Sequence, residues 1–249
     1  MKVCTDACVL GAWADIEVGT RLLDIGTGTG LLALMAAQRN PQAQIDAVEL
    51  DKTAAVQAAQ NVVTSPFAGQ VCVWQTAIQT YLAPESGTSA EAGGRNAASP
   101  ASGQNVPRPV YDHILTNPPF FTNSLRSPDR ALNRALHTDT LPFTELLVAV
   151  CRLLKTTGTW WVLLPPAESD RLIQLAARPI RVGTHPLLPV RQLQLRHNEK
   201  KPVFRHLTAF GFAQNPADVL PEQLSIYEMD GRTYTADYQT LLRPYYLIF

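Results

Sequence analysis

Apolar and polar positions in the first part of the chain form blocks that switch between the strand period and the helix period. Short apolar runs predict strands, and helical spacing between them predicts helices. In chain order these elements are a helix containing Ala7–Trp13, a strand at 21–26, a helix at 30–39, a strand at 44–50, a helix at 52–63 and a strand at about 70–75. Such alternation predicts a parallel sheet with helices on both faces and right-handed crossovers.

The second part of the chain continues the alternation after a break. It predicts a strand at 111–116, a helix at 141–155 ended by Gly158, a strand at 160–164, a helix at 167–177, strands near 179–185 and at 206–212, and a strand-and-helix tail at 222–249. The tail ends in an aromatic cluster, which we interpret as core packing. Seven strands with an antiparallel final pair would complete the sheet.

Residues 83–109 cause the break. They are rich in Ala, Gly, Ser and Pro and contain hardly any large apolar side chain. Such a composition cannot bury enough apolar surface to offset the entropy of ordering. We therefore expect a disordered insertion in a surface connection, within a single domain over residues 1–249.

The strand at 111–116 runs into Asn117-Pro118-Pro119-Phe120. Two successive prolines cannot donate to a ladder, and they hold the preceding residues extended, so an amide is presented at the carboxyl end of a strand. The Asn117 side-chain oxygen and the Pro118 carbonyl can accept both N–H bonds of one exocyclic amine, which aims its lone pair at an electrophile. Phe120 can stack on the same flat base. The motif is typical of methyl transfer to a planar amine.

A binding turn for the methyl donor lies upstream. The strand at 21–26 carries Asp24 and enters a turn with Gly26, Gly28 and Gly30, and the next strand ends at Glu49, where an acidic group commonly binds ribose hydroxyls. A dinucleotide fingerprint would require glycine at position 31. The run instead resembles the S-adenosylmethionine loop of Rossmann-like methyltransferases. Asp24 either orients this turn or meets the amine of the cofactor.

The composition of the chain indicates its cellular compartment and the kinds of ligand that it can bind. The sequence is 46% hydrophobic, yet no apolar run approaches the ~20 residues that span a bilayer, and no secretory signal is visible, so we expect a cytoplasmic protein. The four cysteines are scattered and have no matched spacing with the five histidines, which argues against a metal site. Residues 120–207 carry an excess of seven positive charges within a neutral chain, as expected for a nucleic-acid substrate.

The whole chain resembles the bacterial tRNA1(Val) adenine-N6-methyltransferase family. Three segments carry the resemblance: 1–6 with 10–13 (Leu-Gly-Ala-Trp), 24–34, and 117–121. It implies a Rossmann-like class I methyltransferase fold with a seven-stranded, mostly parallel sheet and an antiparallel final strand. It also implies S-adenosyl-L-methionine as cofactor, tRNA as partner, and cofactor contacts from Thr5, Asp6 and Asn117. Thr5 and Asp6 can equally cap the Ala7–Trp13 helix, and Asp51 is expected to cap the helix at 52–63.

Three departures from the family pattern stand out. An aromatic-rich stretch usually precedes the segment that here begins at Met1, so we expect either an upstream start or a version that lacks part of the lid. Cys4 stands where the family has glycine. Ala77 stands where an acidic residue would meet the cofactor's adenine amine, so this recognition is expected to use backbone groups near Ala77 or Gln75.

Two other functions stay open from the sequence alone. An rRNA guanine-N2 or protein glutamine-N5 methyltransferase shares the amide-gripping loop, although those families usually carry an extra domain before the glycine turn. A cofactor-binding or RNA-binding module without turnover is the third hypothesis, suggested by Ala77 and the segment absent before Met1.

Overall fold

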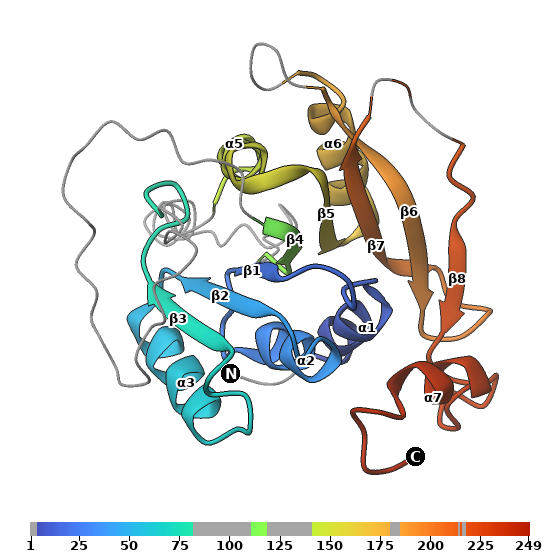
Figure 1. Cartoon of the computed structure of the whole chain (residues 1–249). Helices are drawn as coiled ribbons and strands as arrows, with labels where there is room; N and C mark the ends of the chain where they lie inside the picture. The colour runs from blue at the N-terminus through green and yellow to red at the C-terminus, as the bar shows by residue number, and fades with distance from the viewer. Residues whose placement is uncertain (1–3, 82–110, 119–140, 180–184, 214, 216–217) are drawn as a thin grey trace, which may run out of the picture.

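The computed structural model describes residues 4–81, 111–118, 141–179, 185–213, 215 and 218–249. Their strands form one sheet of eight in the order β3-β2-β1-β4-β5-β7-β6-β8 (Figure 1). The strands are β1 (Arg21–Ile25), β2 (Gln44–Glu49), β3 (Val71–Gln75), β4 (Tyr111–Thr116), β5 (Leu154–Leu164), β6 (Leu187–Arg196), β7 (Val203–Phe212) and β8 (Glu222–Ser225). All neighbours are parallel except β7, which is antiparallel to both β5 and β6.

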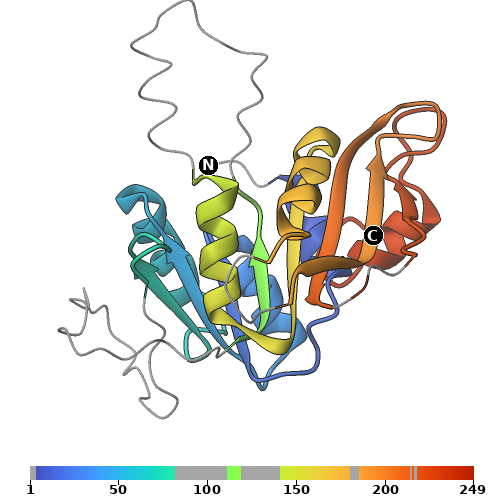
Figure 2. The same cartoon turned by 90° about the horizontal axis from the view of Figure 1, so that it is seen from above.

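Helices cover both faces of the sheet, as Figures 1 and 2 show. The helices are α1 (Thr5–Trp13), α2 (Leu31–Arg39), α3 (Lys52–Val63), α5 (Phe143–Leu153), α6 (Pro166–Ala176) and α7 (Ala236–Leu242). One hydrophobic core lies between the sheet and α1, α2, α3 and α7, and a second lies between the sheet and α5 and α6. The central strands are buried on both faces, which explains their continuous apolar runs.

The expected order of elements from α1 to β4 is confirmed, with shifts of one residue or so at the ends. Asp51 caps α3 as expected, because its side chain accepts a hydrogen bond of 2.8 Å from the amide of Ala54. The antiparallel strand near the end of the sheet is confirmed as β7. The sheet nevertheless has eight strands instead of seven, since β8 from the predicted tail pairs in parallel with β6.

The boundary between α5 and β5 differs from the prediction. The helix ends at Leu153, and β5 begins at Leu154 instead of residue 160, so Gly158 lies inside a strand and does not end the helix. A bulge explains this, because Tyr111 pairs with Leu154 whereas His113 pairs with Thr159. A Cβ atom on Gly158 would lie 2.7 Å from Leu154 Cδ1 and 2.8 Å from the Asp112 carbonyl oxygen, so the bulge requires glycine.

The strand predicted near 179–185 stays a prediction. Residues 180–184 lie outside the described part of the chain, and the next strand that the structure describes is β6 at Leu187–Arg196, which the sequence did not predict. Pro189 hid it in the sequence, since proline is not expected inside a paired strand. The structure accommodates Pro189 at a shift of the β6–β7 register.

The C-terminal aromatic residues pack as core, as predicted. Tyr238 is fully buried, and its ring lies 5.2 Å from that of Tyr234 and 6.0 Å from that of Phe249. This cluster covers α1 together with α7. Residues 83–109, which the sequence predicts to be an insertion, lie outside the described residues.

Candidate active site

The register of three strands brings the predicted site residues to one edge of the sheet. Ile25 pairs with Val48 on one side and with Thr116 on the other. The next residues of these strands, Gly26, Glu49 and Asn117, therefore leave the sheet side by side, about 5 Å from strand to strand. This is the carboxyl edge of the parallel strands, where open α/β sheets bind ligands.

The glycine turn closes with its backbone in the left-handed region. Gly26, Gly28 and Gly30 have φ of 72°, 58° and 86°, which non-glycine residues rarely adopt. A Cβ atom on Gly26 would meet no atom within 4 Å, so the space in front of this residue is open for a ligand. Gly30 is the N-cap of α2 and has no side chain to cap it, so the Leu31 and Leu32 amides have no acceptor within the helix.

The Glu49 side chain links the end of β2 to the glycine turn by a hydrogen bond. Its Oε2 accepts a hydrogen bond of 2.8 Å from the Gly28 amide, and its Oε1 accepts one of 2.9 Å from the Asp51 amide. The carboxylate is half-buried, and each oxygen keeps a further lone pair for a ribose hydroxyl. Sequence reasoning identified Glu49 but missed its bond to the turn. Gly26 is level with Glu49 in the sheet and Gly28 lies two residues further on, and this register between β1 and β2 is set by tertiary structure.

Asp24 is fully buried behind the turn. Its Oδ2 accepts a hydrogen bond of 2.5 Å from the Thr27 hydroxyl, whereas its Oδ1 has no hydrogen-bond partner among the described residues. Burial raises the pKa of this carboxyl to about 7, against the smaller lowering effects of Thr27 and the Ala33 amide. The Thr27 bond agrees with the orienting role predicted for Asp24, and the unpartnered Oδ1 fits a cationic donor such as an ammonium group.

Asn117 directly follows β4. Its Oδ1 is a buried oxygen with no hydrogen-bond partner within the described ranges, and an unpaired buried acceptor of this kind is costly unless a ligand completes it. Pro118 is buried beside it. Thr116, the last strand residue, accepts a hydrogen bond of 3.0 Å from Trp160 Nε1, which fixes the strand end below the amide. Pro119 and Phe120, the other predicted catalytic positions, lie outside the described residues.

The turn after β3 supplies backbone groups at the same edge. Glu49 pairs with Gln75, and the Glu49 carbonyl accepts a hydrogen bond from the Thr76 amide. The carbonyl of Ala77 accepts bonds from the Thr80 and Tyr81 amides, so this oxygen is already used within the turn. Backbone recognition of an adenine near Ala77 stays a prediction.

Thr5 and Asp6 begin α1, but neither caps it. The N-cap residue is Cys4, which makes no side-chain cap bond, so the alternative capping role is wrong. Asp6 Oδ1 does accept a hydrogen bond of 3.1 Å from the neighbouring Ala7 amide. Asp6 also forms an ion pair with Arg205 of β7, with its Oδ2 2.8 Å from Nε. The contacts expected between these two residues and the cofactor stay a prediction.

The chain has many known relatives. A family model described as the methyltransferase small domain matches residues 12–83. The protein named tRNA1(Val) (adenine(37)-N6)-methyltransferase in Dyadobacter fermentans is 43% identical over 250 residues, covering 100% of this chain and 92% of that protein. Proteins of the same name in Pedobacter heparinus and Pseudoalteromonas translucida are 34% and 36% identical, covering 100% and 99% of this chain and 92% of each relative. The chain belongs to the tRNA1(Val) (adenine(37)-N6)-methyltransferase family.

Solved structures agree with the fold of a tRNA1(Val) (adenine(37)-N6)-methyltransferase family member. A predicted O-methyltransferase from Agrobacterium tumefaciens superposes with a TM-score of 0.64 at 14% identity, covering 95% of both chains. At such identity the likeness concerns the fold alone. Membership in the family confirms the resemblance drawn from the sequence, the class I fold, and the expectation of an enzyme that uses S-adenosyl-L-methionine.

The site residues fit that methyl donor. Gly26 leaves open space, Asp24 has an unpartnered buried oxygen that suits an ammonium group, and Glu49 offers lone pairs that suit hydroxyls. Within the described part of the chain no group of three or more acidic, His or Cys side chains could hold a metal ion. No helix among the described residues is long and apolar enough to cross a membrane.

Proposed function

We propose that this enzyme transfers a methyl group from S-adenosyl-L-methionine to N6 of an adenine in tRNA, the adenine at position 37 of tRNA1(Val) named for its relatives. The observation that carries the proposal is the buried, unpartnered Asn117 Oδ1 beside the open glycine turn. One amide acceptor next to a donor-binding turn suits an exocyclic amine. The relatives favour adenine over the guanine and glutamine alternatives.

The chain contributes alignment more than acid–base chemistry. When bound, S-adenosyl-L-methionine supplies an electrophilic methyl group on a sulfonium sulfur. Asn117 Oδ1 accepts one N6–H bond, and the Pro118 carbonyl accepts the other, so the nitrogen lone pair turns out of the plane of the base. Phe120 is proposed to stack on the adenine, and Pro119 to keep the loop extended. The acidic N-methyl ammonium product loses its proton to water, so no general base is required.

Asp24, Glu49 and the glycine turn hold the donor. Asp24 Oδ1 pairs with the cationic amine, and Glu49 binds the ribose hydroxyls while it keeps the turn closed through Gly28. Thr5 and Asp6 are proposed to meet the methionine end. We place the protein in the cytoplasm, where tRNA is its substrate.

The test is radiolabelled methyl transfer to unmodified bulk tRNA, followed by nucleoside analysis. Asn117→Ala should fold and bind cofactor, yet transfer methyl at least a hundredfold more slowly, because it loses a positioned hydrogen bond of ~2.7–4 kcal/mol in a desolvated site. Gln174→Ala, which removes an exposed amide on α6, is the matched control. Methylated guanine or glutamine as product, or full activity of Asn117→Ala, would contradict the proposal.

A further inference from the structure

The hairpin that joins β6 and β7 rises above the site edge. Thr116 pairs with Val162, Val162 pairs with Thr208, and Thr208 pairs with Gln192. Strand β6 continues four residues beyond Gln192 to Arg196, which is about 13 Å above the level of Thr116. We call residues 196–205 the β6–β7 tip. In Figure 2 it lies at the same edge as the end of β4.

Few strands of the sheet lie between Asn117, at the end of β4, and the tip. In the sheet order β4-β5-β7-β6, two strand spacings separate β4 from β7 and three separate it from β6, or about 10 and 14 Å. The tip therefore forms a wall beside the amine-binding residue. A macromolecule whose base enters the site could contact this wall.

The tip concentrates positive charge in a neutral chain. It contains four cations and one carboxylate: Arg196, Lys200, Lys201 and Arg205 against Glu199. Lys200 and Lys201 are exposed and form no ion pair among the described residues. Arg196 has a buried Nε without a hydrogen-bond partner in the same residues. Lys200 and Lys201 are therefore available to an external anion, whereas Arg196 is half-buried.

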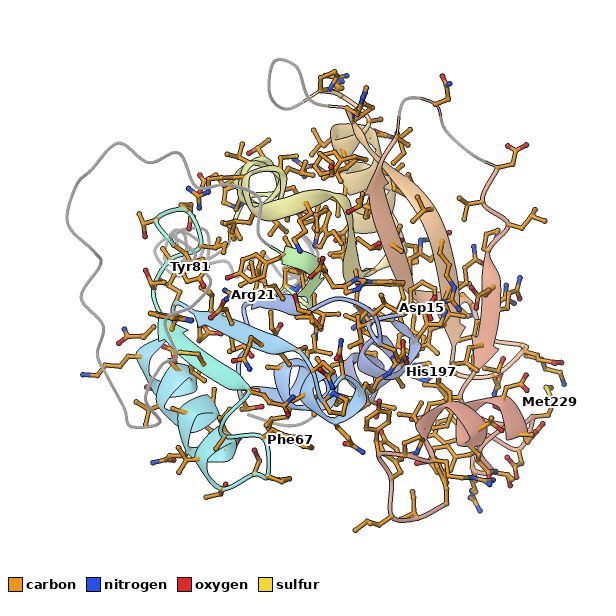
Figure 3. All side chains as sticks on the ribbon, in the orientation of Figure 1. Asp15, Arg21, Phe67, Tyr81, His197 and Met229 are labelled. Atoms are coloured by element: carbon orange, nitrogen blue, oxygen red, sulfur yellow. The ribbon has the colours of Figure 1, made fainter. Side chains whose placement is uncertain are left out.

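The tip also presents a fixed aromatic pair. The rings of His197 and Phe204 are stacked, with centroids 4.2 Å apart and planes 4° apart, and His197 is exposed (labelled in Figure 3). The Arg205 guanidinium lies 5.3 Å from the Phe204 ring centroid, and its ion pair with Asp6 ties the tip to α1. The stack joins the two strands of the hairpin, and the ion pair fixes its β7 side to α1.

We propose that the β6–β7 tip binds the phosphodiester backbone of tRNA next to the target adenine, with Lys200, Lys201 and Arg196 as phosphate contacts and His197 as a stacking surface. This inference rests on the proposed function and names the surface that holds its substrate. Unpaired cations beside an exposed aromatic ring are the combination that single-stranded nucleic acid binds, because it presents phosphates and unpaired base faces together. An acidic peptide would use the cations but not the ring.

The experiment measures the Kd of the full chain for unmodified bulk tRNA at several salt concentrations. The variant Lys200→Ala/Lys201→Ala should bind about tenfold more weakly at 0.1 M salt, and its slope of log Kd against log salt should fall by roughly 1 to 2, as expected for two lost phosphate contacts. Glu199→Lys adds a cation at the same place and should bind more tightly. His197→Ala should weaken binding several-fold without changing the slope.

The matched control is Arg171→Ala/Arg178→Ala, which removes two exposed cations from α6 and its C-terminal end. Thermal midpoints and cofactor affinity verify that every variant is folded. Equal losses in both double variants, no loss in the tip variant, or equal weakening toward a polyglutamate peptide would overturn the tip assignment. If wild type methylates tRNA while the tip variant binds normally, the tip assignment alone fails. If wild type transfers no methyl group to tRNA, the proposed function fails.

Discussion

The phenolic oxygens of Tyr81 and Tyr111 lie 2.8 Å apart in a buried hydrogen bond. These two residues flank 82–110 in the sequence, so their contact joins the two sides of that segment at the amino edge of the sheet. The Tyr111 hydroxyl also donates to Asp46 Oδ2 at 2.6 Å, and Asp46 further accepts bonds from Arg21 and Trp74. Figure 3 labels Tyr81 and Arg21, which lie in this network.

The hydrogen bond between Tyr81 and Tyr111, which we call the clamp, leads to a prediction for the segment between these two residues. Replacing residues 83–109 with about six Gly and Ser residues should change the thermal midpoint by no more than about 2 °C, because the Tyr81–Tyr111 bond already holds the ends together. Affinity for S-adenosylmethionine, measured by calorimetry, should stay the same. A much lower midpoint or a tenfold loss of affinity would mean that the segment packs against the sheet.

The clamp itself should matter more than the segment. Tyr111→Phe leaves the Tyr81 hydroxyl buried without its partner and removes one donor from the Asp46 carboxylate. We expect the free energy of unfolding to fall by about 1–3 kcal/mol, measured by urea denaturation with an unchanged m-value. Tyr245→Phe, which removes a hydroxyl from a half-buried ring in the tail, is the control. Equal effects of the two substitutions would refute a special role for the clamp.

Glu49 should control cofactor affinity. Glu49→Ala strips a charge-assisted acceptor worth roughly 1.5–3 kcal/mol and also releases the amides of Gly28 and Asp51, so S-adenosylmethionine or S-adenosylhomocysteine should bind at least an order of magnitude more weakly. Glu49→Gln keeps one acceptor oxygen, so its cofactor affinity should lie between those of wild type and Glu49→Ala. Glu228→Ala, an exposed carboxylate elsewhere, should have no effect. Unchanged affinity in Glu49→Ala would remove this residue from the site.

Asp24 should make the stability of the cofactor-free enzyme depend on pH. Its pKa is about 7 in the fold and 3.8 in a model peptide, so between these values the folded chain binds more protons than the unfolded chain. Its contribution to stability is therefore fully present below about pH 4 and is lost as pH rises through about 7. Asp24→Asn should remove this loss, so the variant should gain in stability over wild type between pH 5 and pH 8. Urea denaturation of both proteins at pH 5 and pH 8 measures this difference in stability.

The same carboxyl should link cofactor affinity to pH. A cationic amine prefers the ionised Asp24, so wild-type affinity for S-adenosylmethionine should increase from pH 6 to pH 8. In Asp24→Asn the affinity should be lower and nearly independent of pH over this range. Parallel pH profiles for the two proteins would show that Asp24 does not meet the amine.

The local pattern of residues along the chain was sufficient to predict most of the fold. The elements from α1 to β4 follow from apolar periodicity and from Gly and Pro punctuation, because each is a short buried run with clear ends. Where the pattern failed, tertiary geometry had overridden it. Gly158 resembles a helix end, yet the close approach of the Asp112 carbonyl makes it a bulge residue, and Pro189 resembles a break although β6 continues through it.

Within the site, residue types could be predicted but partnerships could not. Asp24, Glu49 and Asn117 were identified from motifs, and the register brings the ends of their strands together. The bonds from Gly28 to Glu49 and from Arg205 to Asp6 join residues 21 and 199 positions apart. No local signal marks such pairs. From the sequence, the β6–β7 tip was only part of the positively charged stretch 120–207, since its height above the edge depends on three strand registers.

The burial of α1 has a consequence for biosynthesis. Seven consecutive residues of this helix, Ala7–Trp13, are buried, and part of their cover comes from far later in the chain. Trp13 bonds Glu222 and lies against Arg191, Asp6 pairs with Arg205, and α7 packs on the helix. During translation α1 leaves the ribosome before these later segments, and its apolar surface stays uncovered until roughly the last quarter of the sequence has been made. The cofactor contacts proposed for Thr5 and Asp6 therefore depend on segments that are made late, so a nascent chain that lacks these segments should not yet be a competent enzyme.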